Sequence, residues 1–160
     1  MGHIDWTEGL SVGIDAIDAQ HRRLIDIINR LDDAIASGGT AGGAGNGLSA
    51  ILAELEDYTK EHFSIEEEAF DETAYPEAKG HKAEHAVFMG KLADFRKALA
   101  GPGRDSSDGR MVGGAGDAGD AGDAGDAGDA AAMLAFLRSW LTRHISFSDK
   151  RYRPWLAGRF

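Results

Sequence analysis

Apolar side chains recur at steps of three and four residues in four segments of the chain, and this spacing constrains the fold more than any other feature. Such spacing places the apolar side chains on one face of an α-helix. The four segments span roughly residues 17–36, 48–70, 77–100 and 130–151, and none shows the alternating pattern of a half-buried strand. The sequence therefore predicts an all-α fold, namely an antiparallel up-down-up-down four-helix bundle with an N-terminal arm.

Two glycine-rich segments separate these helices and are expected to be loops. The first is Gly38–Gly47, and the second is a long Gly/Asp/Ala segment at roughly residues 101–129, between the third helix and the fourth. Glycine costs about 1 kcal/mol per residue in a helix interior, and neither segment carries large apolar side chains that would offset this cost. Five consecutive Gly-Asp-Ala triplets begin inside the second segment, at Gly116. They lack the proline of collagen and the nonapeptide spacing of calcium-binding repeats. We expect a flexible, solvated, acidic loop.

Composition and charge exclude several classes of protein. The chain has 160 residues, which suits one domain, so we expect a single domain over residues 1–160. It has no cysteine, which excludes thiolate metal sites, iron–sulfur clusters and a cysteine nucleophile. Its formal net charge of −10 disfavours nucleic acid and anionic membranes as partners. No stretch approaches the ~20 apolar residues of a membrane span, and the N-terminus lacks a leader pattern, so a cytoplasmic location is expected.

Histidines occupy positions where a helix bundle normally has apolar residues. Five of the six histidines lie on the stripes that are expected to face the core: His21, His62, His81, His85 and His144. One such histidine is usually an ordinary core residue with a hydrogen-bond partner. Five buried imidazoles without partners would each cost about 1–3 kcal/mol, which together rivals the stability of a domain. A metal ion would give each lone pair a bond, and without cysteine its ligands must be nitrogen and oxygen atoms.

Two pairs of these residues have the spacing of neighbours on one helix face. His62 and Glu66 are four residues apart on the second predicted helix, and His81 and His85 are four apart on the third. Residues at this spacing lie one helical turn apart, so both members of each pair can reach the same site.

The last pair does not fit an ideal helix. His144 and Asp149 are five residues apart on the fourth predicted helix, and an ideal helix rotates such a pair apart by about 140°. Their side chains can converge only near a helix end or at a local distortion. The alternative is a helix that ends near Phe147 and leaves Asp149 exposed.

The order of these motifs resembles the hemerythrin family, in its single-domain bacterial form. The chain has a histidine after an aspartate on the first helix, then His-x-x-x-Glu, then Tyr-Pro with His-x-x-x-His, and finally His-x-x-x-x-Asp. Supporting matches are Trp6, Val12-Gly13-Ile14, the Ile17–His21 run and Trp140-Leu141. The resemblance spans roughly residues 6–152, apart from the two glycine-rich loops, and the long loop before the fourth helix departs from the family pattern.

The resemblance implies two non-heme irons held by seven protein ligands. One iron would take His81, His85 and His144, and the other would take His21 and His62. Glu66 and Asp149 would bridge the irons together with an oxo or hydroxo group. One iron is then five-coordinate, and the resemblance implies that O2 binds there reversibly and is held as hydroperoxide.

Further residues are candidates for the surroundings of such a site. Ile25, Trp140 and Leu141 could line the O2 pocket, and ordinary core packing accounts for them equally well. Asp18, Glu67 and Glu68 could supply hydrogen bonds around the ligands, although a first-turn charge and a solvated helix face explain them as well.

The resemblance implies a protein that carries, stores or delivers O2 and is not an enzyme, so no catalytic residue is assigned. The expected ligands are O2, with NO or small anions besides, and an unidentified protein could accept the O2. Two alternatives remain: sensing of O2 or NO through a separate partner, and a diiron oxidase or iron-handling protein. Ferritin-like diiron sites use Glu-x-x-His twice, and this sequence contains no Glu-x-x-His.

Overall fold

The computed structural model describes residues 2–38, 45–100 and 124–160, and this part of the chain forms helices and no strands. The elements in chain order are the 3-10 helix η1 (Glu8–Leu10), the α-helices α1 (Asp15–Ala36), α2 (Gly45–Thr73), α3 (Ala78–Ala100) and α4 (Ala124–Arg143), the π-helix η2 (His144–Asp149) and the α-helix α5 (Lys150–Leu156). The prediction of an all-helical fold with four long helices is confirmed for these residues.

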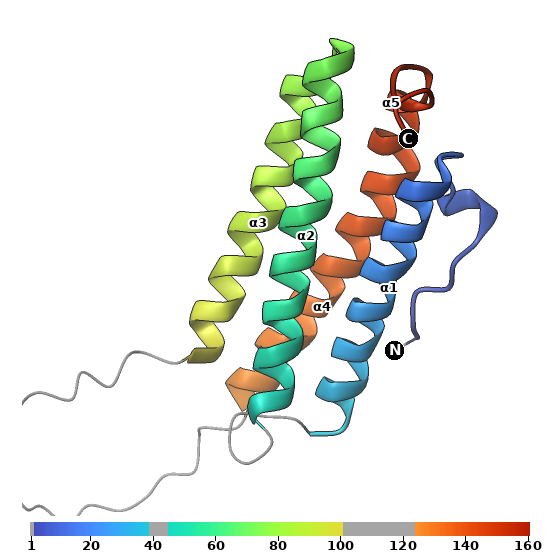
Figure 1. The fold of residues 1–160 in the computed structure, drawn as a ribbon. Helices are drawn as coiled ribbons and strands as arrows, with labels where there is room; N and C mark the ends of the chain where they lie inside the picture. The colour runs from blue at the N-terminus through green and yellow to red at the C-terminus, as the bar shows by residue number, and fades with distance from the viewer. Residues whose placement is uncertain (1, 39–44, 101–123) are drawn as a thin grey trace, which may run out of the picture.

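The four long helices pack side by side around a shared core (Figure 1). Helix α1 contacts α2 and α4, and α3 contacts the same two helices, which closes a ring of four. In Figure 1 the colour ramp runs down α1, up α2, down α3 and up α4, and η2 and α5 continue α4 at the top. None of the helices within the described ranges is long and apolar enough to cross a membrane.

The predicted apolar stripes form the core of the bundle. Side chains from every long helix are buried there, and the largest fully buried ones include Ile17, Leu24, Ile28, Leu55, Phe70, Phe88, Leu92 and Met133. Burial of such side chains contributes about 1.5–3 kcal/mol each relative to exposure, so the stripes supply the main driving force for packing. The core therefore follows directly from the spacing of apolar residues in the sequence.

Asp18 fastens the N-terminal arm to the start of α1. Its Oδ1 accepts a hydrogen bond from the backbone N–H of Val12 at 2.8 Å, and its Oδ2 accepts one from the hydroxyl of Ser11 at 2.6 Å. Farther along, the side chain of Asn29 exchanges two hydrogen bonds with the backbone of Ile4. Asp18 therefore anchors the arm, and the structure gives it no hydrogen bond to a histidine.

Two helices begin earlier than the sequence predicts, because their first residues lie in segments that were predicted to be glycine-rich loops. Helix α2 begins at Gly45, inside the predicted loop 38–47, and α4 begins at Ala124, inside the predicted loop 101–129. Residues 39–44 and 101–123 lie outside the described residues. Ala130 and Met133, in the second turn of α4 and beyond, are buried against the bundle, and this packing together with the helix propensity of alanine outweighs the cost of glycine.

Tyr75 and Pro76 lie between α2 and α3, where proline disfavours continuation of the helix. Ala74 adopts a left-handed backbone conformation with φ of 52°, and the N–H of Tyr75 donates to the carbonyl of Phe70 at 3.0 Å. This turn satisfies one of the free carbonyls at the end of α2.

We expect Leu55→Ala to lower the free energy of unfolding by about 2–5 kcal/mol, because Leu55 is fully buried two turns before His62 on α2. Urea titration followed by circular dichroism measures the change. Val87→Ala, at a residue with 56% exposure, is the control and should change it by less than about 0.5 kcal/mol. Equal effects of the two substitutions would contradict the assigned core.

Candidate metal centre

The π-helix η2 brings the two residues of the irregular pair together. It spans His144–Asp149, and its wider turn bonds each residue to the one five positions away, so residues at this spacing come to lie on one face. His144 Nε2 lies 3.0 Å from Asp149 Oδ1, and Asp149 is fully buried. The sequence left two interpretations open, and the structure has the local distortion. The alternative of an exposed Asp149 after a helix end near Phe147 is wrong, because the helix continues through α5.

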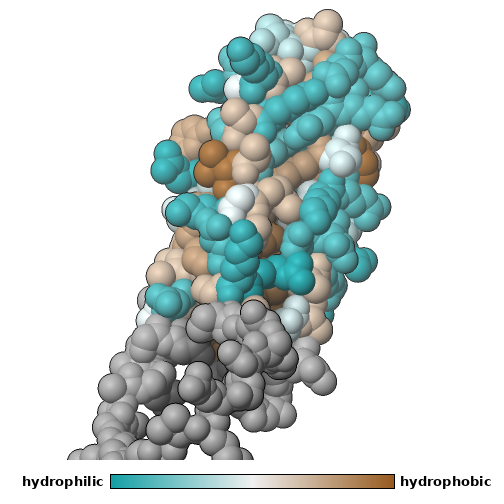
Figure 2. All heavy atoms as spheres, turned by 90° about the vertical axis from the view of Figure 1, so that its left-hand side faces the viewer, coloured by the Kyte–Doolittle hydropathy of each residue, from teal (hydrophilic) through white to brown (hydrophobic). Residues whose placement is uncertain are grey.

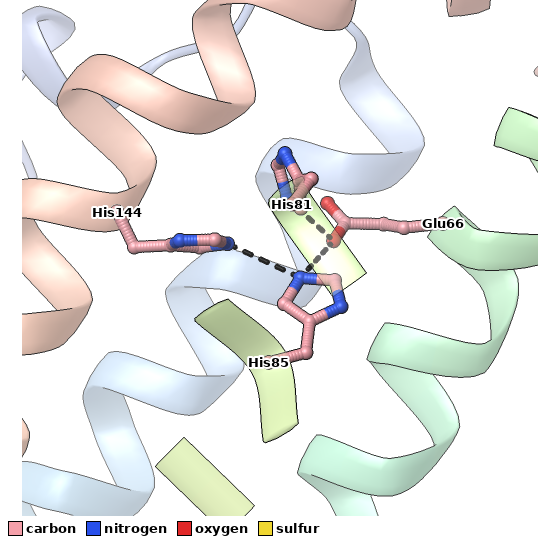
Figure 3. Close-up of side chains that lie close together, drawn as sticks. All are labelled: Glu66, His81, His85 and His144. Atoms are coloured by element: carbon pink, nitrogen blue, oxygen red, sulfur yellow. Dashed lines mark hydrogen bonds and ion pairs between the residues drawn. The ribbon is translucent and has the colours of Figure 1, made fainter. Parts of the chain in front are cut away.

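The predicted ligand side chains converge in one cluster that draws on α1, α2, α3 and η2. Two groups have potential ligand atoms within 4.8 Å of one another: Glu66, His81, His85 and His144 form one, and His21, His62 and Glu66 form the other. Glu66 belongs to both groups. Figure 3 shows the first group, with the imidazoles of His81 and His85 and the ring of His144 gathered around the Glu66 carboxylate.

Asp149 is a second carboxylate that contacts histidines of both groups. Its Oδ2 lies 3.1 Å from His21 Nε2, and its Oδ1 lies 3.1 Å from His81 Nε2. The two oxygens of Glu66 divide in the same way, with Oε1 at 3.6 Å from His62 Nε2 and Oε2 at 3.2 Å from His85 Nε2. Each carboxylate therefore contacts at least one histidine of each group.

All seven side chains are shielded from solvent. None of the seven residues is more than 4% exposed, and His21, Glu66 and Asp149 are fully buried. Charged and polar groups are rarely buried to this degree unless they are paired or bind a metal ion.

Three of the histidines are oriented by oxygen acceptors behind them. His62 Nδ1 donates to the Gln20 amide oxygen at 2.7 Å, His85 Nδ1 to Glu67 at 2.9 Å, and His144 Nδ1 to Glu84 at 2.8 Å. Because these acceptors carry no hydrogen, each Nδ1 holds a proton and each Nε2 faces the cluster. Metal-binding histidines commonly have this arrangement.

Sequence reasoning found only part of this outer layer. Of the three residues considered from the sequence, Glu67 contacts His85, whereas Glu68 is exposed and Asp18 hydrogen-bonds the N-terminal arm. Gln20 and Glu84 were missed because each contacts a histidine on another helix, which no spacing within one helix can reveal.

A tyrosine near the end of the chain was also missed. Tyr152, on α5, is fully buried, and its hydroxyl donates to Glu66 Oε1 at 2.5 Å. Burial raises the pKa of Tyr152 well above its usual value, so the phenol keeps the proton that it donates.

Several polar atoms in the cluster lack a hydrogen bond to any described residue. They are both ring nitrogens of His21, His81 Nε2, Glu66 Oε2 and both carboxylate oxygens of Asp149. A buried polar atom without a partner costs about 1–3 kcal/mol. Imidazole and carboxylate together suit iron and similar transition metals, so these residues fit a metal centre and the metal would satisfy the orphaned atoms.

Burial and charge set the protonation of the histidines in the metal-free protein. Burial lowers the pKa of His62 to about 4 and that of His85 to about 4, so both rings are neutral near pH 7. Burial also opposes a proton on His144, but the neighbouring Asp149 and Glu66 carboxylates outweigh it and raise the pKa of His144 to about 9. A metal ion must displace that proton when it binds.

Aromatic rings line the histidine cluster. Phe63 stacks on His85 with ring centres 3.7 Å apart, and Trp140 stacks on His144 at 4.3 Å. Ile25 and Leu141 are buried in the apolar core, and Trp140 is half-buried. The role of these three residues as walls of an O2 pocket stays a prediction, and Phe63 was missed because its position also fits ordinary packing.

A surface hollow of about 290 Å³ between α2 and α3 leads toward the cluster. Its lining includes His85 and Glu67 together with Lys60 and Lys82. Figure 2 views the molecule from the left-hand side of Figure 1 and shows less hydrophilic side chains between two ridges of hydrophilic ones. The His85–Glu67 pair is therefore the part of the cluster that lies nearest to this opening.

Comparison with known proteins agrees with the fold and the cluster. The family described as the Hemerythrin HHE cation binding domain matches residues 12–156. A bacteriohemerythrin of Stenotrophomonas maltophilia is 32% identical over 95% of this chain and 80% of the relative, and one of Methylococcus capsulatus is 30% identical over 98% and 99%. A crystal structure of a hemerythrin point mutant superposes with a TM-score of 0.73 at 27% identity and covers 98% of this chain and 99% of the other.

The fold and the cluster define a helical bundle whose buried histidines and carboxylates could hold metal ions. The chain belongs to the hemerythrin family, because the family match covers residues 12–156 and relatives of at least 30% identity align along most of its length.

We expect the metal-free protein to lose stability as the pH falls from about 6.5 to about 4. The pKa values of His62 and His85 are lowered to about 4, so the unfolded chain takes up protons in this window before the folded chain does. The loss should be on the order of a few kcal/mol. Urea titrations at a series of pH values measure it.

The control for this pH series is Val87→Ala, which changes an exposed residue without a titratable side chain and should keep the slope of the unfolding free energy against pH. His62→Gln should reduce the slope of the unfolding free energy against pH, because it removes one of the two histidines that take up a proton more readily in the unfolded chain than in the folded one. A slope that is the same in His62→Gln as in the unchanged protein would contradict the assignment.

Proposed function

We propose that this protein binds O2 reversibly at two non-heme irons and thereby carries, stores or delivers it. The proposal takes residues 1–160 as a single cytoplasmic domain, an antiparallel up-down-up-down bundle with a long loop between α3 and α4. The observation that carries it is the position of Glu66 and Asp149 between two groups of buried histidines. A carboxylate whose two oxygens face different histidines is suited to bridge two metal ions.

The distances support a division of the ligands between two irons. His81, His85 and His144 would bind one iron, and His21 and His62 the other, with Glu66, Asp149 and an oxo or hydroxo group as bridges. His85 Nε2 and His144 Nε2 are 3.2 Å apart, which suits two nitrogens that point at one ion. The unequal ligand count leaves one coordination position open for O2.

The irons, when bound, would supply the electrons that O2 binding requires and recover them when O2 leaves. The residues of the chain provide the surroundings in which this exchange can be reversed. The rings of Phe63 and Trp140 lie against His85 and His144 and give the cluster apolar walls there. Glu67, Glu84 and Gln20 hold three imidazoles in fixed orientations, and Tyr152 holds one oxygen of Glu66.

We propose that the cluster binds O2 and does not catalyse a reaction, because of the residue types that form it. Five imidazoles and two carboxylates form the cluster, and the chain lacks the repeated Glu-x-x-His motif of ferritin-like oxidase sites. The relatives named bacteriohemerythrin support the same function. NO and small anions are further ligands of the open position, and a separate protein would receive the O2.

Anaerobic reconstitution with ferrous iron tests the function directly. We expect two irons per chain, a charge-transfer band in the visible spectrum when air is admitted, and loss of this band when O2 is removed. Irreversible consumption of O2 with release of peroxide or ferric iron would overturn the proposal in favour of an oxidase or iron-handling protein.

Removal of one bridging carboxylate should abolish the two-iron site. Glu66→Ala takes away a carboxylate that belongs to both ligand groups, so we expect fewer than two irons per chain and no O2-dependent band. Glu68→Ala is the matched control two residues away, because Glu68 is exposed on the same helix. Iron analysis after gel filtration reports the stoichiometry, and two irons in Glu66→Ala would contradict the bridging role.

A further inference from the structure

Three oxidisable aromatic residues form a continuous path from the cluster to the surface. The ring of Tyr152 lies 5.6 Å from that of His81, the ring of Tyr75 lies 6.4 Å from that of Tyr152, and the ring of Trp155 lies 5.3 Å from that of Tyr75. These separations are within the range of aromatic rings in direct contact.

The two ends of this path lie in opposite environments. Tyr152 is fully buried and donates its hydroxyl hydrogen to Glu66, whereas Trp155 is 42% exposed. Tyr75 lies between them and is 4% exposed, with its hydroxyl 3.4 Å from a carboxylate oxygen of Glu77. The path therefore connects a proposed bridging ligand to solvent through one intermediate ring.

We propose that Tyr152, Tyr75 and Trp155 conduct single electrons between the histidine–carboxylate cluster and the protein surface. Tyrosine and tryptophan are the side chains that most readily lose one electron without a cofactor, and electron tunnelling falls steeply with distance. Steps between touching rings are therefore much faster than one long step. This pathway goes beyond the binding of O2, because it gives the buried cluster a one-electron connection to reductants in solvent.

The electrons and protons balance along the path. When Tyr152 gives an electron to an oxygen-centred radical formed at the cluster, which is thereby reduced to its anion, the phenol proton of Tyr152 shifts along the hydrogen bond to Glu66 Oε1. Tyr75 then reduces Tyr152 and shifts its own proton toward Glu77, and the proton on Glu66 returns. Trp155 reduces Tyr75 and is itself reduced by a small one-electron donor such as ascorbate. The net change is one electron gained from that donor, and the three side chains are restored.

The other aromatic contacts of the cluster do not offer this connection. Phe70 contacts Tyr152 and Tyr75, but a phenylalanine ring is much harder to oxidise than a tyrosine or tryptophan ring. Trp140 stacks on His144, and its other ring contacts among the described residues are with Phe63 and Phe88. Trp140 and Tyr58, whose ring lies under the guanidinium of Arg23, therefore serve as controls.

The test uses the full chain loaded with zinc, which fills a metal site without redox chemistry. Azide radicals generated by pulse radiolysis oxidise tryptophan, and transient absorption distinguishes tryptophanyl from tyrosyl radicals. We expect the tryptophanyl signal to convert into a tyrosyl signal at a rate that does not depend on protein concentration. Trp155→Phe and Tyr75→Phe should lose this phase, whereas Trp140→Phe and Tyr58→Phe should keep it.

A second measurement locates the end of the path. The electron paramagnetic resonance spectrum of the freeze-trapped tyrosyl radical should change in Tyr152→Phe, because the radical then remains on Tyr75. The pathway is overturned if the intramolecular phase is absent from the unchanged protein, if it persists in Tyr75→Phe, or if Tyr152→Phe leaves the spectrum as it was. Circular dichroism of each zinc-loaded variant confirms its fold, and none of these readouts depends on O2 binding.

Discussion

The burial of seven polar ligand side chains inside an apolar bundle is the constraint on which the rest of the structure depends. Six of their nitrogen and oxygen atoms have no hydrogen-bond partner among the described residues, and under the proposed function the bound irons would satisfy them. Apolar stripes on four helices bring these side chains together, and the outer hydrogen bonds from Gln20, Glu67 and Glu84 aim three of the rings inward. Packing energy from the apolar half of the bundle thus holds the polar half in an arrangement that it would not adopt alone.

The π-helix η2 shows how one local irregularity completes the cluster. An α-helical turn over the same residues would direct His144 and Asp149 to different faces and remove Asp149 from the cluster. The wider turn leaves Phe147 67% exposed while Asp149 is fully buried. A π-helix has poorer packing along its axis than an α-helix, so its presence at the ligand positions indicates that contacts of Asp149 with His21, His81 and His144 offset the cost.

Much of the fold and the ligand cluster could be predicted from the sequence because both depend on helical spacing. The apolar residues at steps of three and four predicted the four helices, and the spacing of the histidine pairs predicted that their side chains converge. Boundaries at Gly45 and Ala124 could not be predicted, because packing of later residues such as Met133 outweighs local glycine content. The contacts of Gln20, Glu84 and Tyr152 join separate helices, and such pairings depend on how helices are rotated against one another, which periodicity alone does not fix.

The partners of the histidines also determine how the cluster balances charge. Glu66 and Asp149 lie among the histidines, while Glu67 and Glu84 stand behind His85 and His144, and the partner of His62 is the neutral amide of Gln20. Under the proposed assignment, these four carboxylates and a hydroxo bridge carry five negative charges against the four positive charges of two divalent cations, so the reduced centre would be within one charge of neutrality in a medium that penalises net charge. An increase in metal charge beyond one unit would then be balanced by an incoming anion or a departing proton. The opening beside His85 and Glu67 offers a route for such an exchange with solvent.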